Sequence, residues 1–360
     1  MKILVKAPIG STGGYARDGV GLIQALLRAR HEVDVVPTAV APPLPPDVAE
    51  LLTFPTGDAY DLEIHHVPPT DVDMGAFNRR RSRKVVLWSM WEWDTFPSSV
   101  AGFEKIADNM KQYDMVVGYT KQSLDAFRGA GFLGDDQATA VVQGGFDPSP
   151  WKAYQDTEFR DEVEKMKFPN APFRFGMVGH LSLRKNPYTV LRAFNELKEE
   201  HGDQFNAQLV LKTGFPLLPP QYDAPGVKFI QEINWTDKKL KEFYWTLDCL
   251  INVSWGEGKD LPSMEATMCG IPTILNDTPG HRGWVHPDVQ KLIPTTKMQM
   301  DSEYVGLFTG VEDVKSAMME TYSKRTEAYR RARQLASVIG RSATWDTRVK
   351  RFGKALGLPL

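Results

Sequence analysis

Short apolar runs alternate with segments of helical periodicity along most of this chain, and this alternation restricts the fold more than any other feature. Apolar strands are predicted in the first half at residues 2–7, 33–36, 62–65, 85–88, 115–118 and 139–142. After the first strand, Leu22, Ile23, Leu26 and Leu27 recur at the spacing of one buried helix face. Such strand–helix–strand units form parallel sheets with helices on both faces. The first half is therefore predicted to be a doubly wound α/β domain.

A second series of the same kind follows a charged, proline-containing stretch at residues 147–172. Strands are predicted at residues 173–178, 208–212 and 249–253. Helices are predicted at residues 187–197, 236–247, 262–268 and within 311–356. We place the two domains at residues 1–165 and 166–338, followed by a last segment at 339–360. Two doubly wound domains leave a cleft between the carboxyl edges of their sheets, where such folds bind ligands.

Composition excludes several other classes of protein. The chain has 360 residues, a net charge of −2 and only two cysteines, Cys249 and Cys269. This charge gives no general attraction to nucleic acid or to an anionic membrane, and two cysteines make no disulfide scaffold. The N-terminal apolar run is too short for a signal peptide, and no stretch is long enough to span a membrane. We expect a cytoplasmic protein, with peripheral association with a membrane left open.

The most informative motif begins where the strand at 249–253 ends. A polar, glycine-containing turn carries Glu257, and the helix that follows has Pro262 in its first turn and contains Glu265. This places backbone N–H groups and a positive helix end at the rim of a sheet, which suits phosphate or sugar hydroxyls. Two carboxylates on this turn and helix can reach different parts of one ligand, and carboxylates bind vicinal hydroxyls through paired hydrogen bonds. The alternative is one capping acid and one solvated acid.

A second motif follows the strand at 173–178. Gly179 begins a turn, and Arg184 and Lys185 lie directly before the next predicted helix. Two cations beside a helix N-terminus can neutralise a diphosphate leaving group as its charge develops. On its own, such a pair is also common as surface decoration.

Together these motifs resemble the retaining glycosyltransferases of the GT-B fold, in particular family 4. The stretch from Glu257 to Ala266 is similar to that family's Glu-x7-Glu motif, with Gly258, Leu261 and Pro262 matching between the glutamates. The resemblance implies that Glu257 holds the donor sugar and Glu265 the ribose. It also implies that Arg184 and Lys185, with Gly179, bind the diphosphate. Lys259 and Asp260 stand where the family usually has Phe-Gly, beside the donor sugar.

The resemblance extends more thinly through the rest of the chain. The loop with Gly13 and Gly14 follows the first strand, and in the family this loop faces the donor phosphates and the acceptor. Thr344-Trp345-Asp346 is similar to a segment that precedes a final helix crossing back to the first domain. The resemblance thus implies two Rossmann-like domains facing each other across a cleft, and that residues 339–360 pack on the first.

Candidates for the acceptor or sugar side lie at two further strand ends. His65 and His66 end one strand, and alternate residues of a strand face opposite sides, so the sequence does not decide which one faces the cleft. A buried, hydrogen-bonded histidine is the alternative, and no metal site is predicted because Cys or carboxylate partners at ligand spacing are missing. Trp91, Glu92 and Trp93 follow the next strand and suit a sugar platform or an aromatic core.

The predicted function is transfer of a glycosyl group, a hexosyl group by expectation, from a nucleotide diphosphate sugar to an acceptor hydroxyl. The resemblance implies retention of configuration, no metal and no cofactor besides the donor as co-substrate. A GT-B nucleotide-sugar epimerase or phosphorylase, or a non-catalytic nucleotide-sugar-binding protein, remains the alternative. The acceptor class (sugar, lipid, protein or modified DNA base) is open, as is the oligomeric state. The basic run at residues 79–84 is read as a solvated loop or as a contact for an anionic acceptor.

Overall fold

The computed structural model describes residues 1–10, 13–52, 59–72, 82–151, 171–214, 224–233 and 235–360. The predicted domain boundary at residues 165 and 166 lies outside the described residues. So do Arg79, Arg80 and Arg81 of the basic run.

The first domain contains a sheet of six parallel strands in the order β2-β1-β3-β4-β5-β6. The strands are β1 (Lys2–Gly10), β2 (Glu32–Ala41), β3 (Leu62–His65), β4 (Val85–Ser89), β5 (Met115–Gly118) and β6 (Ala138–Val141). The central strands are buried on both faces, because helices cover both sides of a parallel sheet. The predicted doubly wound sheet is therefore confirmed. Strands β1 and β2 are longer than the sequence predicted.

The second domain contains a parallel sheet in the order β11-β10-β7-β8-β9. Its strands are β7 (Phe173–Gly179), β8 (Ala207–Thr213), β9 (Val227–Gln231), β10 (Cys249–Asn252) and β11 (Thr273–Leu275). An antiparallel pair, β12 (Thr296–Gln299) and β13 (Val305–Phe308), forms a hairpin beside it. The sequence pattern did not predict β9, β11 or this hairpin. They are short, and the residues of β9 and β12 are largely exposed, so their apolar pattern is weak.

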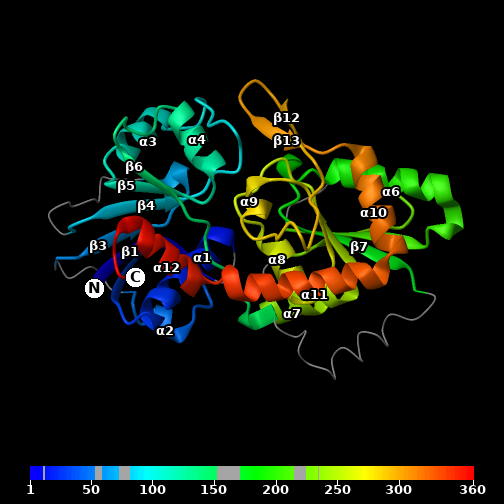
Figure 1. Cartoon of the computed structure of the whole chain (residues 1–360), viewed down its shortest axis with the longest axis horizontal. Coiled ribbons are helices and arrows are strands. Elements are labelled where there is room, and N and C mark those ends of the chain that lie inside the picture. The colour runs from blue at the N-terminus through cyan, green and yellow to red at the C-terminus, as the bar shows by residue number, and fades with distance from the viewer. Residues whose placement is uncertain (11–12, 53–58, 73–81, 152–170, 215–223, 234) are drawn as a thin grey trace.

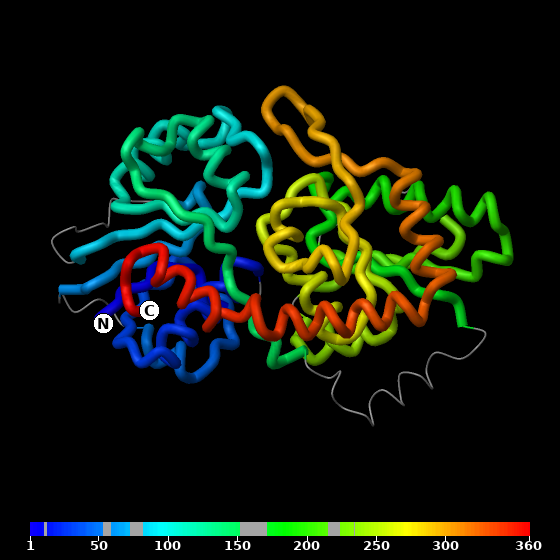
Figure 2. Tube along the Cα trace, viewed as in Figure 1, coloured from blue at the N-terminus to red at the C-terminus, as the bar shows by residue number. Residues whose placement is uncertain are grey.

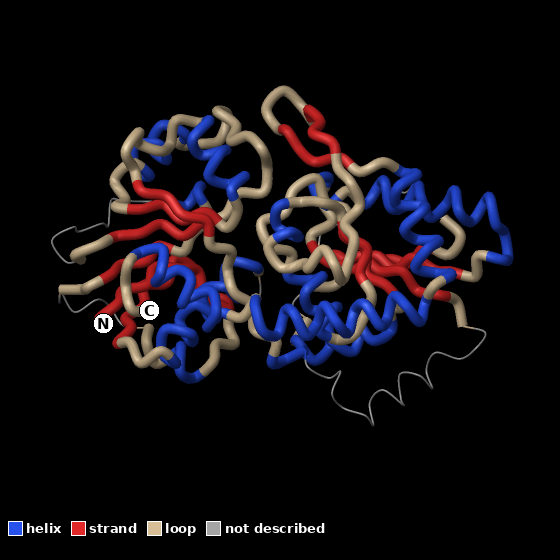
Figure 3. The backbone as a smooth tube through the Cα atoms, in the orientation of Figure 1, coloured by secondary structure: helices blue, strands red, loops and turns tan. Residues whose placement is uncertain are grey.

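Helices surround both sheets, as Figure 3 shows in blue around the red strands. Those of the first domain are α1 (Gly14–Arg28), α2 (Pro46–Ala49), α3 (Phe103–Met110) and α4 (Lys121–Gly129). Those of the second are α6 (Pro187–His201), α7 (Asp237–Thr246), α8 (Leu261–Met268), α9 (Pro279–Arg282) and α10 (Val311–Ser323). Two more end the chain, α11 (Arg325–Ser342) and α12 (Trp345–Leu356). Short 3-10 helices are η1 (Pro69–Asp71), η3 (Leu183–Lys185) and η4 (Gly202–Gln204).

The last helix belongs to the core of the first domain. Figure 1 shows the two domains side by side, with α12 beside α1 and both chain ends in the first domain. The trace in Figure 2 shows α11 running along the second domain toward the first. Trp345, Val349 and Phe352 of α12 are buried in the same apolar cluster as β1 and α1. The ring of Phe352 stacks on Trp88 of β4 at 4.3 Å between centroids.

None of the helices in the described part of the chain combines the length and the apolar character that a membrane crossing needs.

The contact between α1 and α12 gives a test of how the chain end holds the first domain. A Cβ added to Gly21 would lie 2.1 Å from Nε1 of Trp345, so Gly21→Ala forces the helices apart. We expect the free energy of unfolding to fall by about 1–3 kcal/mol, as for other overpacked sites, in a urea titration. The matched control is Gly340→Ala in α11, where a Cβ meets nothing within 4 Å. An equal loss of stability in both variants would contradict this account of the contact.

Candidate functional site

Two neighbouring strand ends of the second sheet build the centre of the site. Strand β7 leads through η3 into α6, and η3 carries Arg184 and Lys185. Strand β10 leads through a loop with Glu257 into α8. Because β7 and β10 pair directly in the sheet, their carboxyl ends lie side by side. The structure therefore brings Glu257 against Arg184 and Lys185, which lie more than seventy positions earlier in the sequence.

Glu257 is the hub of this cluster and only 4% exposed. Its Oε1 accepts hydrogen bonds from the Lys185 ammonium, from Ser254 Oγ at 2.7 Å and from Asn252 Nδ2 at 3.2 Å. Arg184 Nη1 lies 3.5 Å from Glu257 Oε2 and donates to the carbonyl of Gly256 at 2.5 Å. Burial alone would raise the pKa of Glu257, but Lys185 and Arg184 hold that pKa well below its usual range. Glu257 is therefore an anion at neutral pH.

The two helices at this site begin with strained backbone. Of the three non-glycine residues with positive φ in the described parts of the chain, Asn186 (52°) and Asp260 (69°) directly precede α6 and α8. Gly179, at the end of β7, has φ 134°. Any other residue at this position would have a strained backbone. Backbone in sparsely populated regions concentrates at functional sites, where the surrounding packing holds it.

Glu265 lies in α8 and is 1% exposed. Its Oε2 accepts a hydrogen bond from Tyr244 Oη at 2.7 Å, and its Oε1 accepts one from Arg17 Nη1 at 2.6 Å. Burial raises the pKa of Glu265, and Arg17 and Tyr244 oppose the rise. Arg17 also lies 3.2 Å from Asp237 at the start of α7. Arg17 was not among the predicted site residues, although its position as a cation in the first turn after Gly13 and Gly14 was a signal in the sequence.

The glycine loop of the first domain faces this part of the second domain. Gly13 precedes α1 with φ 85°, a conformation that L residues rarely adopt. A Cβ on Gly14 would meet Leu261 Cδ1 at 4.0 Å, so these two predicted site residues lie opposite each other. Nearby, a Cβ on Gly258 would lie 2.7 Å from Met90 Sδ. The first domain thus covers the loop that carries Glu257.

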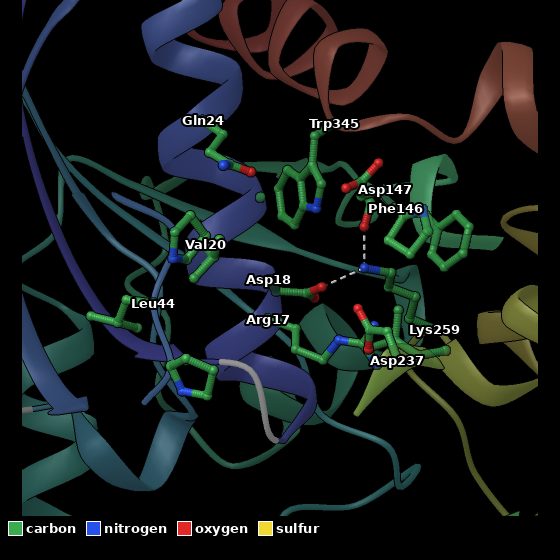
Figure 4. A pocket seen from close by; sticks show the side chains of 17 residues that line it. Arg17, Asp18, Val20, Gln24, Leu44, Phe146, Asp147, Asp237, Lys259 and Trp345 are labelled. Atoms are coloured by element: carbon green, nitrogen blue, oxygen red, sulfur yellow. Dashed lines mark hydrogen bonds and ion pairs between the residues drawn. The ribbon is translucent and has the colours of Figure 1, made fainter. Parts of the chain in front are cut away.

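Lys259 and Asp260 have partners that the sequence did not reveal. The Lys259 ammonium is buried between the domains, where it donates to Asp18 Oδ1 at 2.5 Å and to the carbonyl of Gly145. Figure 4 shows it beside Asp18 and below Trp345, in the wall of a cavity of about 380 Å³ between the domains. Asp260 accepts a hydrogen bond from His281 Nε2 at 3.0 Å. Contact of Lys259 and Asp260 with a donor stays a prediction. In this arrangement the Lys259 ammonium is bound by the protein, while Oδ1 of Asp260 is buried without a hydrogen-bond partner among the described residues.

The structure separates the two histidines that the sequence left equivalent. His65 hydrogen-bonds Glu63 and Tyr113 in the interior of the first domain. His66 donates from Nδ1 to the carbonyl of Trp88 at 2.9 Å, and its ring packs beside Tyr15 and Tyr119. Since Tyr119 Oη donates to Asp18 at 2.8 Å, His66 belongs to the polar network under the domain interface. Both histidines are buried.

Of the three residues after β4, only Glu92 approaches the charged cluster. Its Oε1 lies 3.7 Å from Arg184 Nη2, across the domain interface. Trp91 donates to the carbonyl of Thr95 and packs on Phe96 in an apolar cluster of the first domain. Trp93 packs against Tyr304, in the turn of the β12–β13 hairpin. A role of these aromatic side chains in acceptor binding stays a prediction.

Among the described residues, no three His, Cys, Asp or Glu side chains gather as ligands for a metal ion. The prediction that the site needs neither metal nor cofactor is not tested by that observation.

Comparison with known proteins finds a family match in the second domain. Residues 172–300 match the family described as Glycosyl transferases group 1. A glycosyltransferase of Sulfolobus islandicus rod-shaped virus 1, named uncharacterized glycosyltransferase 335, is 29% identical over 123 residues. That match covers 32% of this chain and 35% of the viral protein.

Solved structures match the whole chain. HepE of Anabaena, crystallised with UDP and glucose, is 18% identical with a TM-score of 0.67 and covers 99% of each chain. Sucrose-phosphate synthase of Thermosynechococcus elongatus is 14% identical with a TM-score of 0.68, over 99% of this chain and 98% of the other. The predicted GT-B fold is confirmed, and so is the resemblance to glycosyltransferases. Retention of configuration stays a prediction.

The buried network under the interface predicts a pH dependence of stability. Burial lowers the pKa of His66 from 6.5 to about 4, so between these values the unfolded chain binds more protons than the folded one. The free energy of unfolding should fall as the pH drops from 6.5 to 4, by up to roughly 3 kcal/mol from this group. Chemical unfolding at several pH values measures this change in the free energy of unfolding. His66→Asn, whose side-chain amide can donate the hydrogen bond that Nδ1 makes, should reduce the dependence of the unfolding free energy on pH.

The same substitution at the exposed His286 serves as the matched control. An identical pH slope in the wild type and His66→Asn would contradict the assignment of this dependence to His66.

Proposed function

We propose that this chain transfers a hexosyl group from a UDP-sugar to an acceptor hydroxyl, with retention of configuration and without a metal ion. The observation that carries the proposal is the buried cluster of Arg184, Lys185 and Glu257, located inside the segment that matches group 1 glycosyl transferases. UDP is the first nucleotide to test, because HepE was crystallised with UDP-glucose and an Escherichia coli trehalose-6-phosphate synthase with UDP-2-fluoro glucose.

The charge balance of the cluster suits a diphosphate. Arg184 and Lys185 share one nearby buried carboxylate, Glu257, while Glu92 lies farther from Arg184 at 3.7 Å. A diphosphate placed against the two cations would form charge-assisted hydrogen bonds with them and replace part of their pairing with Glu257 and Glu92. The two cations would also stabilise the diphosphate as it departs, where the added charge is greatest.

Glu265 supplies the second anchor, for the ribose hydroxyls of the nucleotide. Its two oxygens are occupied by Tyr244 and Arg17, so a bound ribose has to share or displace the Arg17 contact. Arg17 comes from the first domain and Glu265 from the second. Binding of the nucleotide is therefore coupled to the contact between the domains.

The proposed reaction exchanges one bond at the anomeric carbon. The bond from this carbon to the diphosphate oxygen breaks, and a bond to the acceptor oxygen forms on the same face. The departing phosphate oxygen takes the acceptor's proton, so no protein nucleophile is required. Glu257 and Glu265 are almost completely buried, so the donor enters after the domains separate, and closure then excludes water from the reaction.

Substitutions in the cluster test the assignment. Lys185→Ala should lower kcat by about 10²–10³-fold, the usual cost of losing one such electrostatic contact. The same fall is expected whether kcat is measured for sugar transfer or for the slow hydrolysis of the donor. Glu265→Gln should mainly raise the Kd for UDP, because it weakens a contact to the ribose. UDP release is measured with a coupled assay over a panel of UDP-, GDP- and ADP-sugars, and affinity by calorimetry.

The matched control is Arg192→Ala, which removes an exposed cation from α6 that pairs only with Glu196 among the described residues. If UDP release is equally fast in the wild type, Lys185→Ala and Glu265→Gln, the assignment of these residues to the donor site is wrong. Binding of UDP-sugars without any release would instead favour a non-catalytic binding protein. Release of free sugar with altered configuration would favour the epimerase alternative.

Metal dependence is tested separately. With Arg184 and Lys185 compensating the diphosphate, the rate of UDP release should be unchanged in excess EDTA. The assay compares the same preparation before and after chelation, and after re-addition of Mg²⁺ or Mn²⁺. Loss of release on chelation with recovery on re-addition would contradict metal independence and leave the donor assignment standing.

A further inference from the structure

A second groove, of about 740 Å³, lies between the domains. We call it the basic groove. Its walls are the first turn of α4, residues 141–143 at the end of β6, the region of α9, the β12–β13 hairpin and one side of α12. Five cationic side chains and two carboxylates line it, and the cations are Lys121, Arg282, Lys297, Arg348 and Arg351. None of the residues assigned above to the donor lines this groove.

Three of the five cations are already compensated. Lys121 lies 2.6 Å from Asp125, and Lys297 lies 2.5 Å from Asp94. Arg282 forms two hydrogen bonds with Asp277, at 2.5 and 2.7 Å. Their charges are therefore balanced within the protein.

Arg348 is not balanced. It is 4% exposed, and within the described residues it makes no ion pair. Its Nη2 donates to the carbonyl of Gly283 at 2.9 Å, while its Nε is buried and has no hydrogen-bond partner in the described part of the chain. Burial, with the neighbouring charge of Arg351, lowers the pKa of Arg348 to about 10, so it stays a cation at neutral pH. A buried cation without a counterion is less stable than the same cation in water, and an anionic ligand would compensate its charge.

Other elements of the groove favour an anion at the same place. Arg351 is exposed one turn further along α12 and also makes no ion pair among the described residues. The first turn of α4, with Thr120, Lys121 and Gln122, adds the positive end of a nine-residue helix. Guanidinium groups bind phosphate through two parallel hydrogen bonds, which a single phosphate group can accept.

We propose that the basic groove is a binding site for a phosphate-bearing small molecule, held by Arg348 and Arg351. The site is distinct from the donor cluster but mechanically joined to it. Gln143, in the groove wall, donates to the carbonyls of Gly258 and Gly280, and Gly280 packs against the backbone of Glu257. Because the walls come from both domains, a bound phosphate stabilises the closed arrangement around Glu257.

Inorganic phosphate is the probe for the full chain, titrated by calorimetry at constant ionic strength with chloride as the reference anion. Arg348→Met should weaken phosphate binding by about tenfold or more, since it removes the uncompensated guanidinium. The phosphate-dependent rise in Tm should disappear with it. Without phosphate, the Tm of this variant should equal or exceed that of the wild type, because a buried unpaired charge is lost.

The matched control is Lys350→Ala, which removes an exposed cation of the same helix that does not line the groove, and its phosphate affinity should equal that of the wild type. If Arg348→Met does not fold, the exposed Arg351→Glu reverses a charge at the groove mouth and should also lower affinity by about tenfold. Unchanged affinity in the folded variants would overturn the proposal. So would phosphate binding that is lost in Lys185→Met alone, because the phosphate then occupies the donor cluster.

Two further assays distinguish whether the phosphate group belongs to an acceptor or to an effector. Both assays rest on the proposed function. A hexose 6-phosphate that is an acceptor is consumed with UDP release and gains one hexosyl mass. A phosphate that is an effector changes the rate of UDP release and is recovered intact. Calorimetry with the Arg348 variant does not depend on turnover. The phosphate-site proposal can therefore be contradicted while the donor-site assignment is supported, or the reverse.

Discussion

Asp18 and Lys259 form an ion pair that is almost fully buried where the two domains meet. The Lys259 ammonium also reaches the carbonyl of Gly145, in the segment that joins the domains, and lies 5.2 Å from the ring of Trp345. Taking two charges out of water is costly, and removing one partner of such a pair typically costs about 3–5 kcal/mol. The position of α1, the linker and the Glu257 loop relative to each other therefore depends on this pair. Burial lowers the pKa of Lys259, and Asp18 opposes the fall.

The donor cluster is assembled by the same closure. Glu257, Arg184 and Lys185 come from one domain, but Glu92 and Met90 of the other lie directly against their loops. Arg17 of the first domain reaches across the interface and donates a hydrogen bond to Glu265 of the second domain. The charges of the donor cluster are thus paired within the protein, and the proposed donor would have to exchange with some of these contacts. Strained backbone at Asn186 and Asp260 marks the two helix starts where that exchange would take place.

Two buried cations near the domain junction have opposite surroundings. Lys259 has a carboxylate, a carbonyl and an aromatic ring. Arg348 has one carbonyl and neighbouring positive charge. This asymmetry, and not the number of cations alone, distinguishes the basic groove from an ordinary charged surface.

The sequence by itself determined the two α/β domains, since apolar periodicity is a local property that each strand and helix carries. It also determined that Glu257, Glu265, Arg184 and Lys185 follow carboxyl ends of strands in one sheet, because parallel strands place those ends at one edge. The short strands β9 and β11 carried too little pattern to be found.

Only the tertiary structure decided which charges pair. Lys259 meets Asp18 across 241 positions of sequence, and Arg17 meets Glu265 across 248. It also decided that His66, not His65, joins the interface network, because strand alternation sets two faces without saying what covers each. Arg348 appears in the sequence as one more helical cation. That it is buried and meets no counterion among the residues that the structure describes follows only from packing, because burial and pairing depend on what the rest of the chain brings within a few ångströms.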